Sequence, residues 1–162
     1  MPAKRSRKII SGGQTGADRG GLDAAIELGI PHGGACPKGR RAEDGVIPGK
    51  YALGETRSTD YVERTEQNVI ASDGTVVFTF GAPEGGSALT VELATQHRKP
   101  LLHLDLKRID EEAAARELGS WIRKNEVAIL NVAGSRESKA AGLGKLVWRI
   151  VKAAYLQERA GG

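Results

Sequence analysis

The chain alternates between short apolar runs and helical patterns along almost its whole length, and this alternation constrains its fold most. Five apolar runs are predicted strands: Lys8–Ser11, His32–Cys36, Thr75–Phe80, Pro100–Leu104 and Val127–Val132. Five segments have helical patterns: Ala17–Leu28, Asp60–Ala71, Ser87–Gln96, Asp110–Lys124 and Leu143–Arg159. Such alternation is typical of βαβ units with right-handed connections. The sequence therefore predicts an α/β fold with three layers, in which a mainly parallel sheet of about five or more strands has helices on both faces.

The domain organisation follows from the length and from one segment that breaks the pattern. With 162 residues the chain suits a single domain, which we place at residues 9–162 after a basic leader at residues 1–8. The segment Gly33–Arg57 is rich in glycine, proline and charged residues. Because a stretch of this kind in a compact domain is usually a functional loop or a lid, we expect one here.

The charge balance argues against a nucleic-acid-binding protein. The chain has 24 Lys and Arg residues against 20 Asp and Glu residues, and four of the cations lie in the leader. The excess therefore equals that short run, whereas nucleic-acid-binding domains carry a broad basic face, often with aromatic residues for stacking. The single cysteine suits a reducing compartment, and no apolar run approaches the roughly 18 residues of a membrane span. We expect a cytoplasmic protein with no nucleic-acid or membrane partner.

Many of the 22 glycines lie where a predicted strand gives way to a helix. At the first such junction the sequence reads GGQTGADRGG, which differs from both the dinucleotide-binding and the P-loop patterns. Glycines let the backbone approach a ligand, and the free N–H groups of a helix start favour an anion. We interpret this turn as an anion site rather than a tight turn with polar caps. Its candidate residues are Gly12, Gly13, Gln14, Thr15 and Gly16.

Two further strand ends carry residues of the same kind. The second junction offers Gly85, Gly86, Ser87 and Thr90, and the nearby Glu92 faces either the site or solvent. The third offers Asn131, Gly134 and Ser135, followed by the cations Arg136 and Lys139. Because the carboxyl ends of parallel strands meet at one edge of a sheet, three such loops indicate a phosphorylated or nucleotide-like ligand.

Two weaker features leave alternatives open, and a third argues against a metal site. Cys36 lies beside three cations, so it is either a reactive thiol or, more in keeping with free cysteines, a small buried residue. Arg64 and Asn68 are four residues apart on a predicted helix and share either a ligand wall or a solvated face. The three histidines have no companion ligand at metal spacing, so we predict no zinc site.

Several long segments closely resemble the molybdenum-cofactor carrier proteins, and together they cover nearly the whole chain. These segments are Ser11–Gly45, Thr56–Asn68, Gly85–Ala94, Leu102–Leu106 and Leu130–Gly142. The resemblance implies a Rossmann-like fold of the lysine-decarboxylase-like group, assembled as a homotetramer. It also implies binding, storage or delivery of molybdenum cofactor (Mo-molybdopterin, a phosphorylated pyranopterin). The partners would be molybdoenzymes or proteins of cofactor synthesis.

We interpret the chain as a carrier of this cofactor, or of a related phosphorylated ligand, with no catalytic residue. The phosphate would lie against the N–H groups of Gly12–Gly16 or Gly85–Ser87. Three cations could add charge-assisted contacts to phosphate or to an oxo-metal group: Arg19, Lys38 and Arg40. Neutral hydrogen bonds would come from Thr15, Ser87, Thr90, Asn131 and Ser135.

A wider resemblance gives the alternative, a nucleotide-binding phosphoribohydrolase-like enzyme or a nucleotide sensor. The phosphoribohydrolases of this fold group use an Arg-Lys pair on one helix, and here Arg64 is followed by Thr65. Their Pro-Gly-Gly-x-Gly-Thr-x-x-Glu loop corresponds to residues 84–92, which lack the proline and one glycine. These departures weaken the enzymatic interpretation relative to the carrier.

Overall fold

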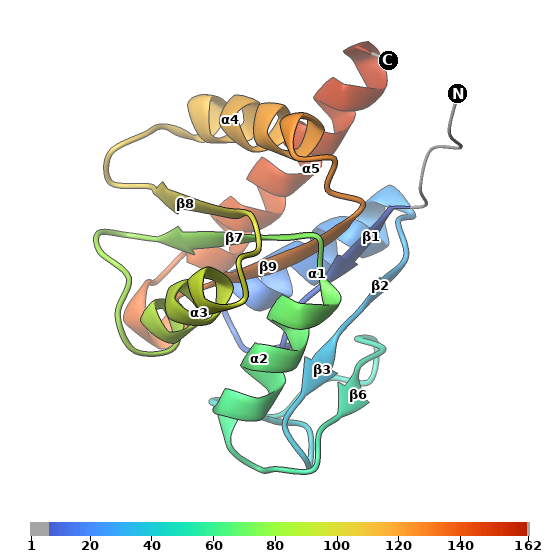
Figure 1. The fold of residues 1–162 in the computed structure, drawn as a ribbon, viewed down its shortest axis with the longest axis vertical. Helices are drawn as coiled ribbons and strands as arrows, with labels where there is room; N and C mark the ends of the chain where they lie inside the picture. Colours follow the sequence, from blue (N-terminus) through green and yellow to red (C-terminus); the bar gives the residue numbers. More distant parts are fainter. Residues whose placement is uncertain (1–6, 162) are drawn as a thin grey trace.

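The computed structural model describes residues 7–161, with side chains up to residue 157, and has a five-stranded parallel sheet at its centre (Figure 1). The strands lie in the order β2-β1-β9-β7-β8. Their bounds are Lys8–Ile10 for β1, His32–Gly33 for β2, Gly74–Thr79 for β7, Leu101–Asp105 for β8 and Ile129–Gly134 for β9. Residues 1–6 of the expected leader lie outside the described residues, and Lys8 belongs to β1.

Helices cover both faces of the sheet, which confirms the predicted three-layer α/β architecture. Their bounds are Ala17–Leu28 for α1, Tyr61–Ala71 for α2, Gly85–Gln96 for α3, Glu111–Lys124 for α4 and Leu143–Gly161 for α5. Helices α1, α4 and α5 pack together on one face, and α2 and α3 pack together on the other (Figure 1). Helix α2 begins as predicted because the Asp60 side chain accepts hydrogen bonds from the N–H groups of Val62 and Glu63.

Strand β9 joins the two halves of the sheet, although it is the last strand along the chain. It pairs in parallel with β1 on one side and with β7 on the other. The core between this sheet and α5 includes Val132 and the apolar stripe of the helix. The stripe consists of Leu143, Val147, Ile150, Val151, Ala154 and Tyr155. The strand order reverses where β9 lies between β1 and β7, and the carboxyl ends of four strands lie beside this point. Ligands of α/β sheets bind at such a point.

Residues 34–58 form a small lobe with its own short strands, in the segment where we expected a functional loop or a lid. Strand β3 (Ala35–Cys36) pairs with β6 (Gly54–Glu55) in parallel, and β4 (Arg41–Ala42) pairs with β5 (Gly45–Val46) in an antiparallel hairpin. The lobe packs on α1 through a hydrophobic cluster of Leu22, Cys36, Ile47 and Tyr51. The segment is therefore packed on the domain through a buried cluster of its own.

The predicted strand His32–Cys36 is split into β2 and β3 at Gly34. This glycine has φ +125°, and a Cβ atom there would lie 2.2 Å from the carbonyl oxygen of Ser11. The backbone must therefore turn and pass close to the end of β1, which only glycine allows. As a result β2 belongs to the main sheet and β3 to the lobe.

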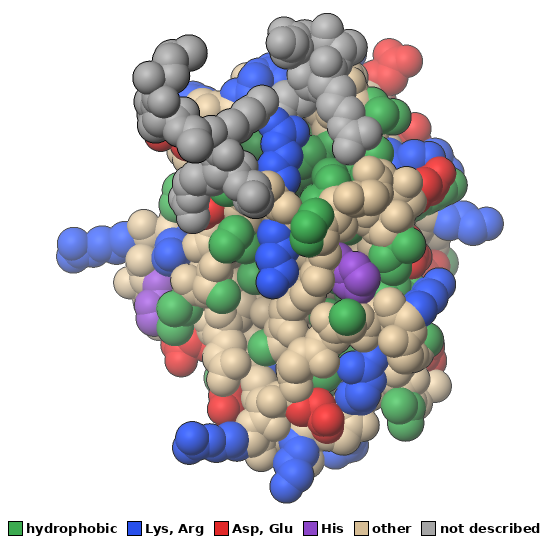
Figure 2. Space-filling view, turned by 90° about the vertical axis from the view of Figure 1, so that its right-hand side faces the viewer, with side chains coloured by type: hydrophobic (Ala, Val, Ile, Leu, Met, Phe, Trp, Pro, Cys, Tyr) green, Lys and Arg blue, Asp and Glu red, His purple; other side chains and the backbone are tan. Residues whose placement is uncertain are grey.

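The surface and the helices give two further observations. On the face shown in Figure 2, the described Lys and Arg side chains are separated by uncharged and acidic residues rather than joined in one patch. Within residues 7–161, the structure has no helix that is both long enough and apolar enough to span a membrane.

Candidate functional site

A cavity of about 430 Å³ opens at the carboxyl edge of the sheet. Its walls come from the loops after β1, β7, β8 and β9, from α2, and from the start of α3. Eight of the residues predicted from the sequence line it: Gln14, Arg64, Gly85, Gly86, Ser87, Thr90, Gly134 and Ser135. The predicted convergence of three strand ends on one edge is therefore what the structure shows.

The amino-terminal turn of α3 is a part of the wall that is open to a ligand. Gly85 and Gly86 are exposed, and a Cβ atom built on either would have no neighbour within 4 Å. Ser87, the next residue, is buried. Its Oγ donates to the carbonyl of Glu84 and accepts from the N–H of Glu84, so its hydroxyl is already used by the protein. The helix thus begins two residues earlier than predicted. It presents its first N–H groups, with the positive end of the helix dipole, to the cavity.

Four basic side chains surround the cavity: Arg64, Lys107, Arg136 and Lys139. Arg136 and Lys139 lie where the sequence placed them, after β9. Lys107 was not predicted, although it follows the end of β8 by two residues and so belongs to the same edge. Two acids, Asp18 and Glu84, also line the cavity, so basic groups are in excess there.

A buried ion pair at the cavity wall joins the first loop to α2. Nη1 of Arg64 lies 3.2 Å from Oδ2 of Asp18, and both side chains are largely buried. Burial raises the pKa of Asp18 above its ordinary value, although Arg64 and the N–H of Gln14 oppose this shift. Asp18 was not predicted as a site residue, because an acid in the first turn of a helix usually faces solvent. Its partner is 46 residues away along the chain, so nothing local marks the pair.

Apolar and aromatic groups also line the cavity. They are the side chains of Phe80, Tyr61 and Leu89. The Arg64 guanidinium lies over the Tyr61 ring, 5.2 Å from the centroid of that ring. Flat aromatic surfaces suit a planar ligand ring, whereas the basic groups suit an anion. The cavity therefore has the two kinds of surface that a phosphorylated ring compound needs.

The glycines of the first loop contact the protein itself rather than the cavity. A Cβ atom at Gly12 would lie 1.9 Å from Nη1 of Arg64, and one at Gly16 would lie 2.4 Å from the carbonyl oxygen of Ser135. At Gly13 it would lie 2.6 Å from Cδ1 of Leu53 in the small lobe. These glycines let Arg64, the β9 loop and the lobe pack closely around the end of β1.

Other protein groups bind the polar side chains of this region. The Thr15 hydroxyl donates to the Glu43 carboxylate and accepts from the N–H of Glu137 at 3.1 Å. Arg19 forms two hydrogen bonds with the Asp44 carboxylate, at 2.6 and 2.8 Å. The hairpin β4–β5 is thus tied to the loop after β1. Neither Thr15 nor Arg19 lines the cavity.

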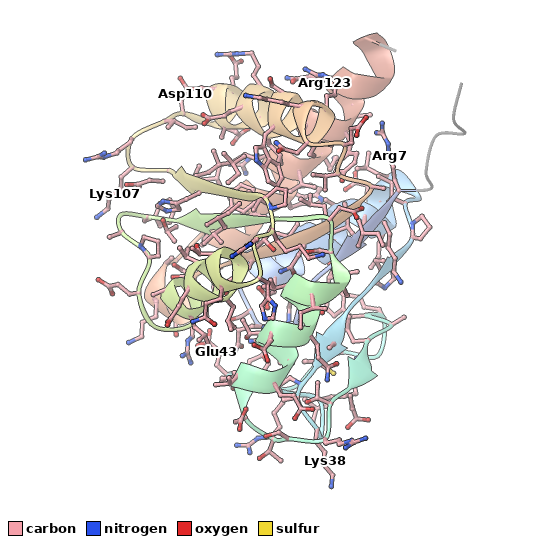
Figure 3. The ribbon with its side chains drawn as sticks, viewed as in Figure 1. Arg7, Lys38, Glu43, Lys107, Asp110 and Arg123 are labelled. Carbon is pink, nitrogen blue, oxygen red and sulfur yellow. The ribbon has the colours of Figure 1, made fainter. Side chains whose placement is uncertain are left out.

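The other predicted site residues outside the cavity have structural partners or lie far from it. The Arg40 guanidinium donates to the carbonyls of Ile47, Pro48, Tyr51 and Leu53 and so organises the small lobe. Asn68 bonds both backbone groups of Ala35, and Asn131 donates to Thr75 inside the sheet. Figure 3 shows Lys38 at the outer end of the small lobe, well away from Lys107 on the loop after β8.

Two open alternatives from the sequence are resolved by the geometry. Cys36 is fully buried in the lobe cluster, and burial raises the pKa of its thiol, so it is the small buried residue rather than the reactive one. Glu92 is exposed, accepts a hydrogen bond from Gln96, and does not line the cavity. Among the side chains of residues 7–157, no three of His, Cys, Asp or Glu are grouped to hold a metal ion.

The fold and the cavity define a class of protein: Rossmann-like α/β domains with a cavity at the carboxyl edge of a parallel sheet, which is where such sheets bind ligands. Within this class the chain belongs to the circularly permutated YpsA SLOG family, which matches residues 9–155. A crystal structure of a protein from Syntrophus aciditrophicus SB, named "Putative molybdenum carrier protein", is 47% identical with a TM-score of 0.90. That match covers 92% of this chain and 94% of the other. No curated protein matches the chain. The two matches confirm the predicted family and the Rossmann-like fold.

Proposed function

We propose that the protein binds molybdenum cofactor in the cavity and stores or delivers it. The observation that carries the proposal is the joint presence of an open helix start and four basic side chains around one cavity. Helix starts and basic side chains together are the usual protein partners of a phosphate. In this proposal the phosphate of the cofactor lies against Gly85 and Gly86, with Lys107, Arg136 and Lys139 neutralising its charge.

The pterin ring would then lie against the apolar part of the wall. Phe80 and Tyr61 offer aromatic surface, which stacks favourably on a flat ring. A volume of about 430 Å³ is within the usual range for small-molecule sites. Size, charge and surface thus all suit a phosphorylated pterin, and the similar crystal structure is named as that of a molybdenum carrier, which supports a ligand related to molybdenum.

The polar groups of the cavity support a carrier better than a hydrolase. The hydroxyl protons of Ser87, Thr90 and Thr65 are donated to backbone carbonyls in their own helices or turns. None of these three hydroxyls is therefore placed beside a base that could make it a nucleophile. Glu92, the residue that the phosphoribohydrolase alternative would need, lies outside the cavity. Binding and release without covalent chemistry is what a carrier requires.

The same proposal includes a homotetramer in the cytoplasm that passes the cofactor to molybdoenzymes or receives it from proteins of cofactor synthesis. Val62 and Ile70 on α2 are large, apolar and exposed, and would be available for contacts between copies. Analytical ultracentrifugation of the purified protein tests the assembly, and a monomer at micromolar concentration would contradict it.

The experiment that tests the ligand uses protein from two hosts, one that makes molybdenum cofactor and one that cannot. Molybdenum is measured by mass spectrometry and pterin by fluorescence after oxidative release, on the same sample. We expect near-stoichiometric pterin only from the first host. Lys139→Glu should lower the bound pterin about tenfold, because it reverses a charge at the cavity. Lys124→Glu, the same change at the far end of α4, should leave it unchanged. Protein without pterin from either host would refute the proposal.

A further inference from the structure

The side-chain amide of Gln14 has a fixed orientation. One terminal atom, Oε1, accepts hydrogen bonds from two backbone N–H groups, those of Thr15 at 3.1 Å and Glu43 at 2.9 Å. Because both partners are donors, this atom must be the oxygen of the amide, and the amide nitrogen must point the other way. The first loop and the β4–β5 hairpin therefore set the polarity of Gln14 together.

The amide nitrogen, Nε2, is left for a ligand. Gln14 lines the cavity and is 8% exposed. Within the described residues, no protein acceptor lies within hydrogen-bonding distance of Nε2. The atom is also not fully buried, so a ligand or water can reach it. A largely buried amide thus presents two N–H donors to the cavity.

The groups next to Gln14 are also donors or are already occupied. Oδ2 of Asp18 accepts from the backbone N–H of Gln14 and from Nη1 of Arg64. Arg64 carries further N–H groups, and its Nε is buried without a partner in the described part of the chain. This stretch of wall therefore offers hydrogen-bond donors, and its one carboxylate is already engaged by the protein.

We infer that Gln14 is a specificity-determining residue that selects ligands with an acceptor oxygen at this wall and rejects ligands with a donor there. The inference rests on the proposed function for the kind of ligand, because it places a phosphorylated pterin in this cavity. The acceptor has two sources in such a ligand, a phosphate oxygen or the ring carbonyl. An opposing N–H or NH₂ group would leave buried donors facing each other, which is costly.

The first test uses the unmodified protein and two ring probes. Neopterin carries a ring carbonyl, and its 4-amino analogue has a donor at the same ring position. If the ring carbonyl is the acceptor, calorimetric titration should show neopterin binding at least about tenfold more tightly than the analogue. If phosphate is the acceptor, the two ring probes should bind alike, and inorganic phosphate should respond to the change described next.

The second test is Gln14→Glu, measured at pH 8 so that the new carboxyl is ionised. One carboxylate oxygen can still accept from Thr15 and Glu43, while the other replaces the cavity-facing donor with an acceptor. Ala82→Glu is the matched control, because Ala82 is exposed, lines the same cavity and gains the same charge. Thermal unfolding of each variant shows whether the fold is retained.

The inference is supported if Gln14→Glu abolishes the preference for neopterin, or if it weakens inorganic phosphate binding at least about tenfold more than Ala82→Glu does. It is overturned if Gln14→Glu leaves the relative affinity for the two ring probes as it is in the unmodified protein and weakens inorganic phosphate binding no more than Ala82→Glu does. A protein that carries no pterin from either host, but binds phosphate in a Gln14-dependent way, would refute the proposed function and leave this inference standing.

Discussion

The loops after β1 and β7 are both rich in glycine but differ in what surrounds those glycines. Both are glycine-rich turns from a strand into a helix, and both look like anion sites from the sequence. In the loop after β1, the positions of Gly12, Gly13 and Gly16 are packed so tightly that a Cβ atom would clash with the protein. In the loop after β7, the positions of Gly85 and Gly86 are open. A glycine cluster therefore indicates that another group comes close to the backbone. Whether that group belongs to the protein or to a ligand can be decided only from the fold.

The largest effect on stability is expected from Gly16→Ala. Gly16 has φ +81°, and the added Cβ would meet the backbone of the β9 loop at Ser135 and Glu137. Strain and clash together should lower the free energy of unfolding by about 4 kcal/mol, measured by urea denaturation. The control is Gly29→Ala, where φ is +71° but nothing lies within 4 Å. That variant should lose only about 1 kcal/mol. Equal losses would show that strain, not packing, accounts for the effect.

A somewhat smaller effect is expected from Arg64→Met, which leaves the buried Asp18 carboxylate without its cation. Removal of one partner from a buried pair should cost about 3 kcal/mol. Arg64 opposes the rise in the pKa of Asp18, so this pKa should rise further in the variant. Stability lost through a raised carboxyl pKa grows as pH increases, so the difference from the unmodified protein should be larger at pH 8 than at pH 5. Arg116→Met, on the exposed face of α4, serves as the control.

No loss at all in Arg64→Met would show that the pair does not stabilise the first loop, whereas a loss that is the same at both pH values would show that Arg64 stabilises by packing and not by its charge. The same urea denaturation, run at the two pH values on both variants, gives this answer.

Glu43→Gln tests the contact of the β4–β5 hairpin with the loops after β1 and β9. We expect the free energy of unfolding to fall by about 1 kcal/mol. The Glu43 carboxylate accepts from the N–H of Ser138 at 3.1 Å and from the hydroxyls of Ser138 and Thr15. Burial alone would raise the pKa of Glu43, but these hydrogen bonds outweigh it and lower the pKa. Because the pKa of Glu43 is lower in the folded protein, its carboxylate stabilises the fold at pH values above the ordinary carboxyl pKa. This stabilisation is lost as the pH falls through the folded-state pKa. The variant and the unmodified protein should therefore converge in acid.

The measurement is thermal unfolding between pH 3 and pH 7, with Glu117→Gln on α4 as the comparison. A gap that persists unchanged at the acid end would contradict the assigned role of the ionised carboxylate.

The smallest effect on stability is expected from Gly86→Ala, and it has the opposite sign. The position is open and lies in the first turn of α3, so alanine should stabilise the protein by about 0.5 kcal/mol. The added methyl group would stand where the ligand approaches the helix start, so inorganic phosphate should bind about tenfold more weakly. Calorimetry and thermal unfolding of one sample measure both quantities. Unchanged phosphate affinity would remove the loop after β7 from the site.

Periodicity in the sequence was sufficient to predict all five helices and the strands of the main sheet, except that the strand expected at His32–Cys36 ends at Gly33, because long amphipathic or apolar segments are locally determined. The small lobe was missed because its strands are two residues long, too short to show any alternation. The location of the cavity was predictable from the strand ends. Its inner wall was not, since the pairing of Asp18 with Arg64 and of Gln14 with Glu43 depends on contacts between distant parts of the chain.

The central place of β9 has a consequence for how the protein is made. This strand lies between β1 and β7 but is synthesised after both, so the emerging chain cannot complete its sheet until residue 134 has left the ribosome. Until then β1 and the strand pair β7–β8 are two unjoined pieces, each with an unpaired edge. The cavity draws on both pieces, so it cannot be complete before β9 joins them. A prematurely terminated chain would have neither the sheet nor the site.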